Sequence, residues 1–219
     1  MTKFIERTKA IQLRLEGNSY SEIKKQIDVS KSSLSLWLRD IPLTNKQIRR
    51  IKNNKEKAIE RFRETMRHKR EKRLSGYYKK QKKRWFPFSN REQFLTGLFL
   101  YWGEGNKASQ HSISISNTDP GVLKFSLHWM RKSLKIPSQS IKVYLQLYSD
   151  MNVEEAINFW SMELGIPKNQ FNKPYIKVST RSLIDQKGFG YGTCNIVAQN
   201  TRIKENILMT IKAISDKYA

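Results

Sequence analysis

The carboxylate best placed for chemistry in this sequence is Glu104, which lies between two glycines at the end of the apolar run LTGLFLYWGEGN, residues 95–106. The apolar residues of this run recur at helical spacing and predict a helix. A carboxylate at the C-terminal end of a helix is disfavoured by the helix dipole, and a nearby cation removes the conflict. Glu104 is therefore a candidate metal ligand. The alternative is that it pairs with Lys107 or with a strand arginine and serves structure alone.

Gly97 and Gly103 lie six residues apart on this predicted helix. A glycine inside a helix costs about 1 kcal/mol relative to alanine, so it is a poor helix former. Without side chains, the two positions allow another helix to approach closely. Their spacing therefore indicates a helix-packing device.

The segment resembles the LAGLIDADG homing-endonuclease family, whose signature helix ends in Asp-Gly-Glu-Gly or a close variant. Gly97, Gly103, Glu104 and Gly105 match this signature, whereas Trp102 stands where the signature has its first Asp. The downstream segment HSISISNTDPGVLKFSLHWMRKSL is similar to the family's strand, Asn-x-Asp and amphipathic helix. The resemblance covers roughly residues 92–215.

The resemblance implies an α/β domain in which two signature helices pack through their glycines. It also implies that Glu104 binds a divalent metal, Mg²⁺, at a DNA cleavage site; without catalysis, no cofactor is expected. Trp102 at the position of the first Asp weakens the case for an enzyme. Two functions stay open: sequence-specific DNA binding without chemistry, and Mg²⁺-dependent DNA cleavage.

One pattern occurs twice in the C-terminal part of the chain. HSISISNTDPGVLKFSLHWMRK and CNIVAQNTRIKENILMTIKAI both read as a strand, Asn-Thr and an amphipathic helix. Setting AINFWSMELG under GLFLYWGEGN aligns Ala156 with Gly97 and Glu163 with Glu104. A true repeat makes the domain a pseudo-dimer within one chain, as in monomeric members of the family. Glu163 is then a second candidate catalytic carboxylate, because two-metal phosphodiester cleavage uses paired acids.

The N-terminal segment predicts three short helices. Residues 3–16 have helical apolar spacing and are stopped by Gly17-Asn18. Ser19 caps a second helix, with Glu22 completing a capping box. Ser30 then caps a third helix whose inner face is apolar.

The outer face of this third helix carries the residue types that read a DNA major groove. Small hydroxyls allow close approach, and cations reach bases or phosphates. The candidate DNA-binding residues are Ser30, Lys31, Ser32, Ser33, Ser35 and Arg39. The pattern resembles the helix-turn-helix of resolvases, transposases and many repressors. A three-helix bundle that binds protein is the alternative.

The net charge of +23 is concentrated between residues 45 and 85, where 18 basic and 4 acidic side chains give a net of +14. This segment predicts a helical connector, broken at Ser75-Gly76, that neutralises nucleic-acid phosphates. Its last cations are Lys79, Lys80, Lys82, Lys83 and Arg84. A solvated helix without a partner and an RNA-binding or recombination accessory protein are alternatives. An anionic membrane surface is disfavoured because large apolar residues are few.

Together these patterns predict an α+β chain in three parts. These are a helix-turn-helix domain over 1–44, a basic helical linker over 45–86 and a LAGLIDADG-like α/β domain over 87–219 with a mostly antiparallel sheet. Strands are expected at 112–116, 141–150, 175–180 and 193–200. The last two are expected to be joined by a hairpin turn at the glycine-rich residues Gly188, Gly190 and Gly192.

The composition limits the compartment and the partners. The single Cys194 excludes an internal disulfide and cysteine-rich zinc sites. No run of 18 apolar residues and no charged-then-apolar leader occurs. We therefore expect a cytoplasmic, nucleoid-associated protein that is not secreted and does not bind membranes. The expected partner is double-stranded DNA, and the expected state is a monomer with a pseudo-dimeric domain or a homodimer.

Overall fold

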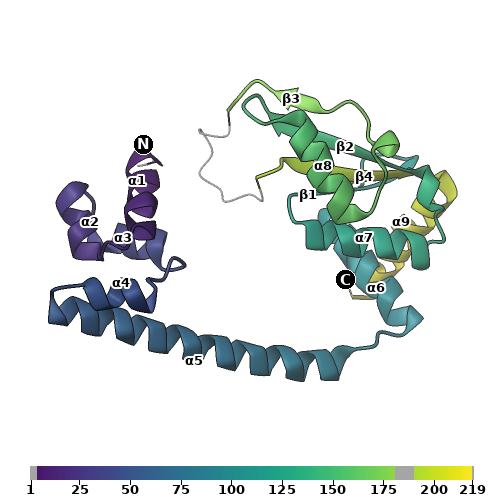
Figure 1. Cartoon of the computed structure of the whole chain (residues 1–219). Helices are drawn as coiled ribbons and strands as arrows, with labels where there is room; N and C mark the ends of the chain where they lie inside the picture. The colour runs from purple at the N-terminus through teal and green to yellow at the C-terminus, as the bar shows by residue number, and fades with distance from the viewer. Residues whose placement is uncertain (1–3, 181–189, 219) are drawn as a thin grey trace. The chain divides into compact units, whose positions relative to one another are not determined.

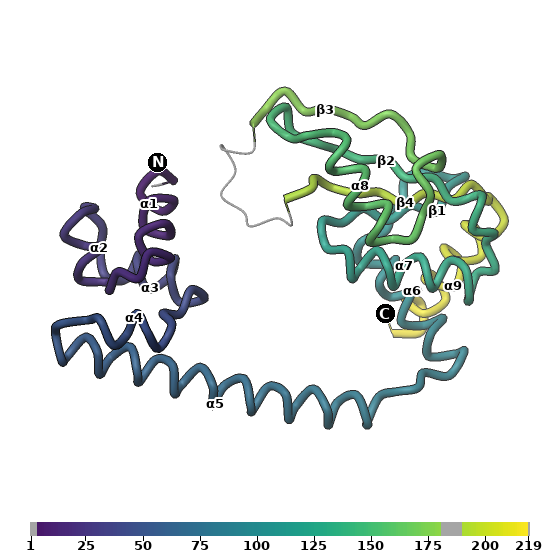
Figure 2. Tube along the Cα trace, viewed as in Figure 1, coloured from purple at the N-terminus to yellow at the C-terminus, as the bar shows by residue number. Residues whose placement is uncertain are grey.

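The computed structural model describes residues 4–180 and 190–218, and these form nine α-helices, two short 3₁₀ helices and one four-stranded sheet. The predicted α+β class is confirmed. The chain divides into two compact units, Met1–Phe86 and Pro87–Ala219, whose elements are coloured along the chain in Figures 1 and 2. Each unit is described by itself.

Unit 1 is entirely helical within its described residues. Its helices are α1 (Phe4–Leu15), α2 (Tyr20–Gln26), α3 (Lys31–Leu38), α4 (Asn45–Arg50) and α5 (Asn54–Trp85). Ser19 and Glu22 form the predicted capping box at α2, and Ser30 caps α3. A small apolar core joins α1, α2 and α3 through Ala10, Ile23, Leu34 and Leu38.

The connector differs from its prediction in where it is broken. The break lies at residues 51–53, between α4 and α5, and Asn53 caps the new helix. Helix α5 then continues through Ser75-Gly76 for 32 residues, which corresponds to about 48 Å. The predicted break was wrong because one glycine costs only about 1 kcal/mol and the flanking Lys, Arg, Leu and Glu residues favour helix.

Unit 2 combines four helices with the sheet. The helices are α6 (Asn90–Glu104), α7 (Pro120–Lys132), α8 (Val153–Leu164) and α9 (Thr201–Tyr218). The strands are β1 (Ser112–Asn117), β2 (Ile141–Tyr148), β3 (Tyr175–Lys177) and β4 (Thr193–Gln199), in the order β1-β4-β2-β3. The mostly antiparallel sheet is confirmed, because only the β2–β3 pair is parallel.

The expected hairpin between the third and fourth strands was wrong. β2 lies between β3 and β4 in the sheet, so the two strands are not partners. β4 is central because it pairs with β1 on one side and with β2 on the other, whereas the short and largely exposed β3 lies at an edge. Of the proposed hairpin glycines, Gly188 lies outside the described residues.

One face of the sheet and the four helices enclose the core of unit 2. Along β2 the side chains alternate, so that Val143 and Leu145 are buried and Lys142 and Tyr144 are exposed. Helices α6, α7, α8 and α9 supply the rest of the core around two fully buried tryptophans. On β2 the face of the sheet away from the core therefore carries exposed side chains.

Among the described residues, no helix has the length and apolar character needed to cross a membrane.

Candidate nucleic-acid interface

Five of the six side chains that the sequence assigned to DNA are exposed on α3 and its two caps. These are Ser30, Lys31, Ser32, Ser35 and Arg39, whereas Ser33 is half-buried. Ser30 and Ser33 also hold the start of the helix. The Ser30 hydroxyl accepts a hydrogen bond from the Ser33 backbone N–H at 3.0 Å, and the two hydroxyl oxygens lie 2.9 Å apart. The exposed set thus combines two cations with three small hydroxyls.

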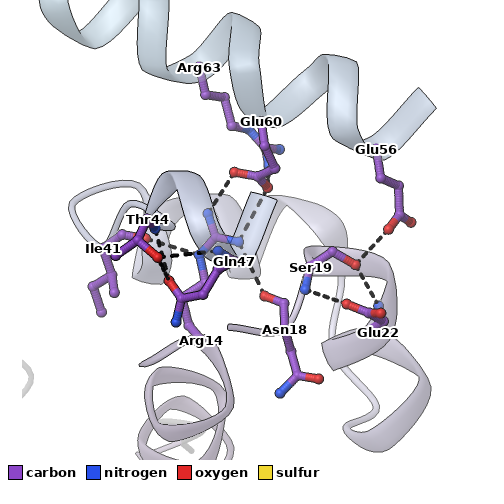
Figure 3. Close-up of polar contacts among 10 residues, drawn as sticks. All are labelled: Arg14, Asn18, Ser19, Glu22, Ile41, Thr44, Gln47, Glu56, Glu60 and Arg63. Atoms are coloured by element: carbon purple, nitrogen blue, oxygen red, sulfur yellow. Dashed lines mark hydrogen bonds and ion pairs between the residues drawn. The ribbon is translucent and has the colours of Figure 1, made fainter. Parts of the chain in front are cut away.

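A buried ion pair attaches α5 to the three-helix core. Arg14 of α1 donates to both carboxylate oxygens of Glu60, at 3.2 and 2.8 Å, and both side chains are almost fully buried (Figure 3). Arg14 also donates to the backbone carbonyls of Asn18 and Ile41, while Arg63 donates to Glu60 at 2.6 Å. Four segments of unit 1 therefore meet at one polar cluster.

The sequence analysis missed this cluster. Glu60 is the only buried side chain of α5, and its partner is 46 residues away in the chain. In the sequence Glu60 belongs to a regular series of glutamates at four-residue spacing, which is typical of a solvated helix. The one signal in the sequence was Arg14, which lies on the apolar side of the first predicted helix and therefore needs a buried acidic partner.

A groove of about 610 Å³ separates the exposed face of α3 from the first turns of α5, a size typical of ligand clefts. On one side it is lined by Lys31, Ser32, Ser35 and Arg39. On the α5 side it is lined by Glu56, Ile59, Glu60 and Arg63. The predicted DNA-reading residues therefore share a concave surface with two carboxylates of α5.

The C-terminal half of α5 is strongly cationic. Between residues 72 and 85 it carries seven Lys or Arg side chains and no acid. The five predicted phosphate-binding residues, Lys79, Lys80, Lys82, Lys83 and Arg84, are all exposed. Nothing in this half of the helix is buried, so its charges are free to meet an anionic surface.

In unit 2, Glu104 is the last residue of α6 and is exposed. Within the described part of the chain its carboxylate has no hydrogen-bond or ion-pair partner. Lys107, the structural partner considered from the sequence, instead donates to the Trp102 carbonyl at 2.9 Å. A cation therefore does meet the C-terminal end of this helix, but it binds the backbone and leaves the Glu104 carboxylate free.

A second lysine, which the sequence analysis missed, lies beneath the same turn. Lys204 of α9 is fully buried and donates to the Tyr101 hydroxyl and, at 2.6 Å, to the Asn106 carbonyl. Burial, and then the charge of Lys107, lower the pKa of Lys204, and burial raises the pKa of Tyr101 to about 12. These contacts fix the backbone just after Glu104.

Glu163, the second candidate carboxylate, has a different environment. It lies on α8 and forms an ion pair with Lys124 of α7 at 2.5 Å. Helix α7 packs against both α6 and α8 and lies between them in Figure 1. No contact among the described residues joins Glu163 to Glu104. The two halves of the sequence repeat also share one sheet, since β1 and β4 are antiparallel neighbours.

The two signature glycines play different parts. A Cβ at Gly97 would overlap the indole of Trp129, so this glycine does allow a close helix contact, with α7. A Cβ at Gly103 would meet nothing within 4 Å. The packing prediction is thus confirmed for Gly97, whereas Gly103 faces open space. Phe99 is also half exposed and stacks on Trp102 with ring centroids 5.9 Å apart.

The chain matches no protein-family model, no curated protein and no solved structure. Within the described ranges, no group of three or more His, Cys, Asp or Glu side chains is arranged to hold a metal ion.

Proposed function

We propose that this protein binds double-stranded DNA sequence-specifically, with α3 in the major groove and α5 along the phosphate backbone. The observation that carries the proposal is the exposed surface of unit 1. There, cations and small hydroxyls on α3 adjoin a long helix whose last fourteen residues hold seven cations and no acid. Phosphate contacts supply affinity and position, whereas the side chains on α3 supply sequence preference.

The test is selection from a randomised duplex library, followed by fluorescence anisotropy over a range of salt concentrations. Each phosphate neutralised contributes about −0.9 to the slope of log K against log salt. Replacing the five cations between Lys79 and Arg84 with Gln is expected to reduce the magnitude of that slope by up to about 4.5 and to weaken binding to all sequences alike.

Arg39→Gln is expected to change which DNA sequence the library selection enriches, in addition to any change in the salt dependence of binding. Lys212→Gln is the matched control, because this exposed lysine of α9 is bonded to Asp216. Failure of the wild-type protein to bind any duplex at low salt would rule out the proposal. Tighter binding to duplex RNA than to DNA would replace it with RNA binding.

We also propose a second candidate, a Mg²⁺-dependent DNA endonuclease, which the free carboxylate of Glu104 favours. Mg²⁺ prefers oxygen ligands and retains several waters, so an exposed carboxylate without a partner fits as one ligand. A pair of such ions stabilises the attacking and leaving oxygens of a phosphodiester. In the endonuclease candidate, Glu104 holds the metal, and Lys204 and Tyr101 fix the backbone that follows Glu104.

The endonuclease candidate requires a second carboxylate near the first. Glu163 is bound to Lys124 and belongs to a helix that α7 separates from α6. The second acid would therefore come from Glu104 of another copy, with the open side of α6 at Gly103 as the contact between copies. Sedimentation of the full chain tests this: a strict monomer that cuts DNA would contradict the arrangement.

The decisive experiment is a cleavage assay on supercoiled and random-library DNA with Mg²⁺ or Mn²⁺, run beside Glu104→Gln and Glu163→Gln. Metal-dependent cutting that is lost only in Glu104→Gln supports the endonuclease. Binding without cutting, unchanged by either variant, leaves DNA binding as the function. Cutting that survives Glu104→Gln assigns the activity to another site.

A further inference from the structure

A carboxylate of α5 lies against the surface that the proposed function assigns to DNA. Glu56, in the first turn of α5, accepts a hydrogen bond from the Ser19 hydroxyl at 2.6 Å (Figure 3). The Asn53 side chain fixes this turn by accepting from the Glu56 backbone N–H. Glu56 also lines the groove in front of α3, beside Lys31. The backbone and the carboxylate of Glu56 are therefore both held in place by hydrogen bonds.

The surroundings of Glu56 favour a negative charge. Burial acts to raise the pKa of this carboxyl, but hydrogen bonds from Ser19 and Ser21, with the charges of Lys25 and Lys31, outweigh it and hold the pKa below its ordinary value. The Ser19 hydroxyl bonds this carboxylate directly, and Ser21 and Lys31 line the same groove. Ser19 is itself buried, with 1% of its surface exposed, so its hydroxyl is oriented in advance.

These donors belong to the types that bind backbone phosphates in protein–DNA complexes. Hydroxyls and lysines around an oxyanion form charge-assisted hydrogen bonds, and a carboxylate and a phosphate oxygen compete for the same donors. The free chain therefore holds an oxyanion site next to the recognition surface, filled by its own side chain.

We propose that Ser19, Ser21 and Lys31, which line the groove with Glu56, form a binding site for one phosphate of the DNA backbone, and that Glu56 occupies this site in the free protein. The inference rests on the proposed DNA binding and deepens it. The carboxylate excludes the phosphate and lowers affinity for every duplex by the same factor, because a phosphate carries no sequence information. Removing the negative charge lets the phosphate compete for these donors, because a neutral amide oxygen accepts hydrogen bonds more weakly than a carboxylate.

The test compares Glu56→Gln with Glu71→Gln in the full chain, using anisotropy on one random-sequence duplex over a salt series. Both variants remove one negative charge from α5, but Glu71 is exposed and lies outside the groove. Glu56→Gln is expected to raise affinity about tenfold more than Glu71→Gln, the value of a charge-assisted hydrogen bond. It is also expected to steepen the salt slope by about 0.9.

A second pair of variants keeps the test independent of folding. Adding Lys31→Gln to Glu56→Gln should remove the gained slope, whereas Lys31→Gln alone should change the slope less, because its charge already faces Glu56. Equal affinities and slopes for Glu56→Gln and Glu71→Gln would overturn the phosphate site while leaving DNA binding intact. Absence of duplex binding by both the wild type and Glu56→Gln would overturn the two proposals together.

Discussion

The two units of this chain are stabilised in different ways. In unit 2, Trp129 and Trp160 are fully buried in a core to which every helix and β1, β2 and β4 contribute. In unit 1 the long helix α5 buries a single side chain, Glu60, between two arginines. Apolar packing positions the elements of unit 2, whereas a few polar contacts position α5.

The difference follows the distribution of charge. The first 86 residues carry a net charge of +17, and the remaining 133 carry +6. A segment with that many cations has few apolar side chains to bury, so its orientation depends on directional polar contacts. A packed core distributes its stabilisation over many contacts, but an ion pair fails when one partner is removed. Unit 1 should therefore be the more sensitive to single polar substitutions.

Removing one partner of the buried ion pair is the largest test of this contrast. Arg14→Met leaves Glu60 buried with Arg63 as its remaining cation. We expect unit 1 to lose about 3 kcal/mol, the lower end of the range for a broken buried pair. Amide hydrogen exchange in α1 and α5 measures the loss, and exchange in unit 2 serves as the internal control. The double replacement Arg14→Met and Glu60→Leu should recover much of the loss. A single Arg14→Met variant without effect would contradict a stabilising role of the buried ion pair.

The corresponding test in unit 2 is Gly97→Ala. The added methyl group meets the indole of Trp129, and overpacking of this kind costs about 1–3 kcal/mol. Gly103→Ala is the matched control on the same helix, because it faces open space and gains up to about 1 kcal/mol of helix propensity. Chemical denaturation followed by tryptophan fluorescence measures both. Equal effects of the two substitutions would show that Gly97 is not a packing position.

The elements that the sequence predicted well are those with local signals. Ser19 and Ser30 each cap the helix expected of them, because a cap and its helix are adjacent in the chain. Alternation placed β1, β2 and β4 within a few residues of their observed bounds. The sheet order was not predictable in this way, since the pairing of β4 with β1 and β2 depends on how the whole core packs.

The contacts that the sequence analysis missed join residues distant in the chain. Lys204 lies on an amphipathic helix where a lysine is normally exposed, and its partner Tyr101 is 103 residues away. The pairing of Arg14 with Glu60 was missed for the same reason, because the two residues are 46 positions apart in the chain. For the candidate sites, residue types identified exposed positions such as Lys31 and Glu104, but not the neighbours that occupy or support them.

The Lys204 cluster predicts a pH dependence specific to unit 2. Tyr101→Phe removes a hydroxyl bonded to Lys204 and Asn106, and should cost about 1–2 kcal/mol at neutral pH. The pKa of Tyr101 is raised from 10.0 to about 12, so between these values the unfolded chain loses this proton and the folded chain keeps it. Stability therefore falls with rising pH in the wild type through this window, and the fall is shallower in Tyr101→Phe.

Urea denaturation at pH 7, 10 and 11.5 measures this difference. The lowered pKa of Lys204 affects stability below about 10.5, the ordinary value for lysine, so most of the tyrosine window is free of it. A gap between wild type and variant that stays constant from pH 10 to 11.5 would contradict the buried hydroxyl.

The smallest expected change in stability is at Gly76. Alanine is expected to stabilise the protein there, whereas it destabilises the protein at Gly97. A Cβ at Gly76 would meet nothing within 4 Å, and the position lies inside the continuous helix α5. Gly76→Ala should therefore stabilise α5 by about 0.5–1 kcal/mol, through propensity alone. Hydrogen exchange of the amides from Leu74 to Tyr78 measures the gain, with Ser75→Ala as the neighbouring control. A helix broken at Ser75-Gly76 would show no such protection, because alanine would then replace a glycine in a turn. Glycine-to-alanine substitution is thus expected to stabilise the solvent-exposed helix at Gly76 and to destabilise the helix that packs against Trp129 at Gly97.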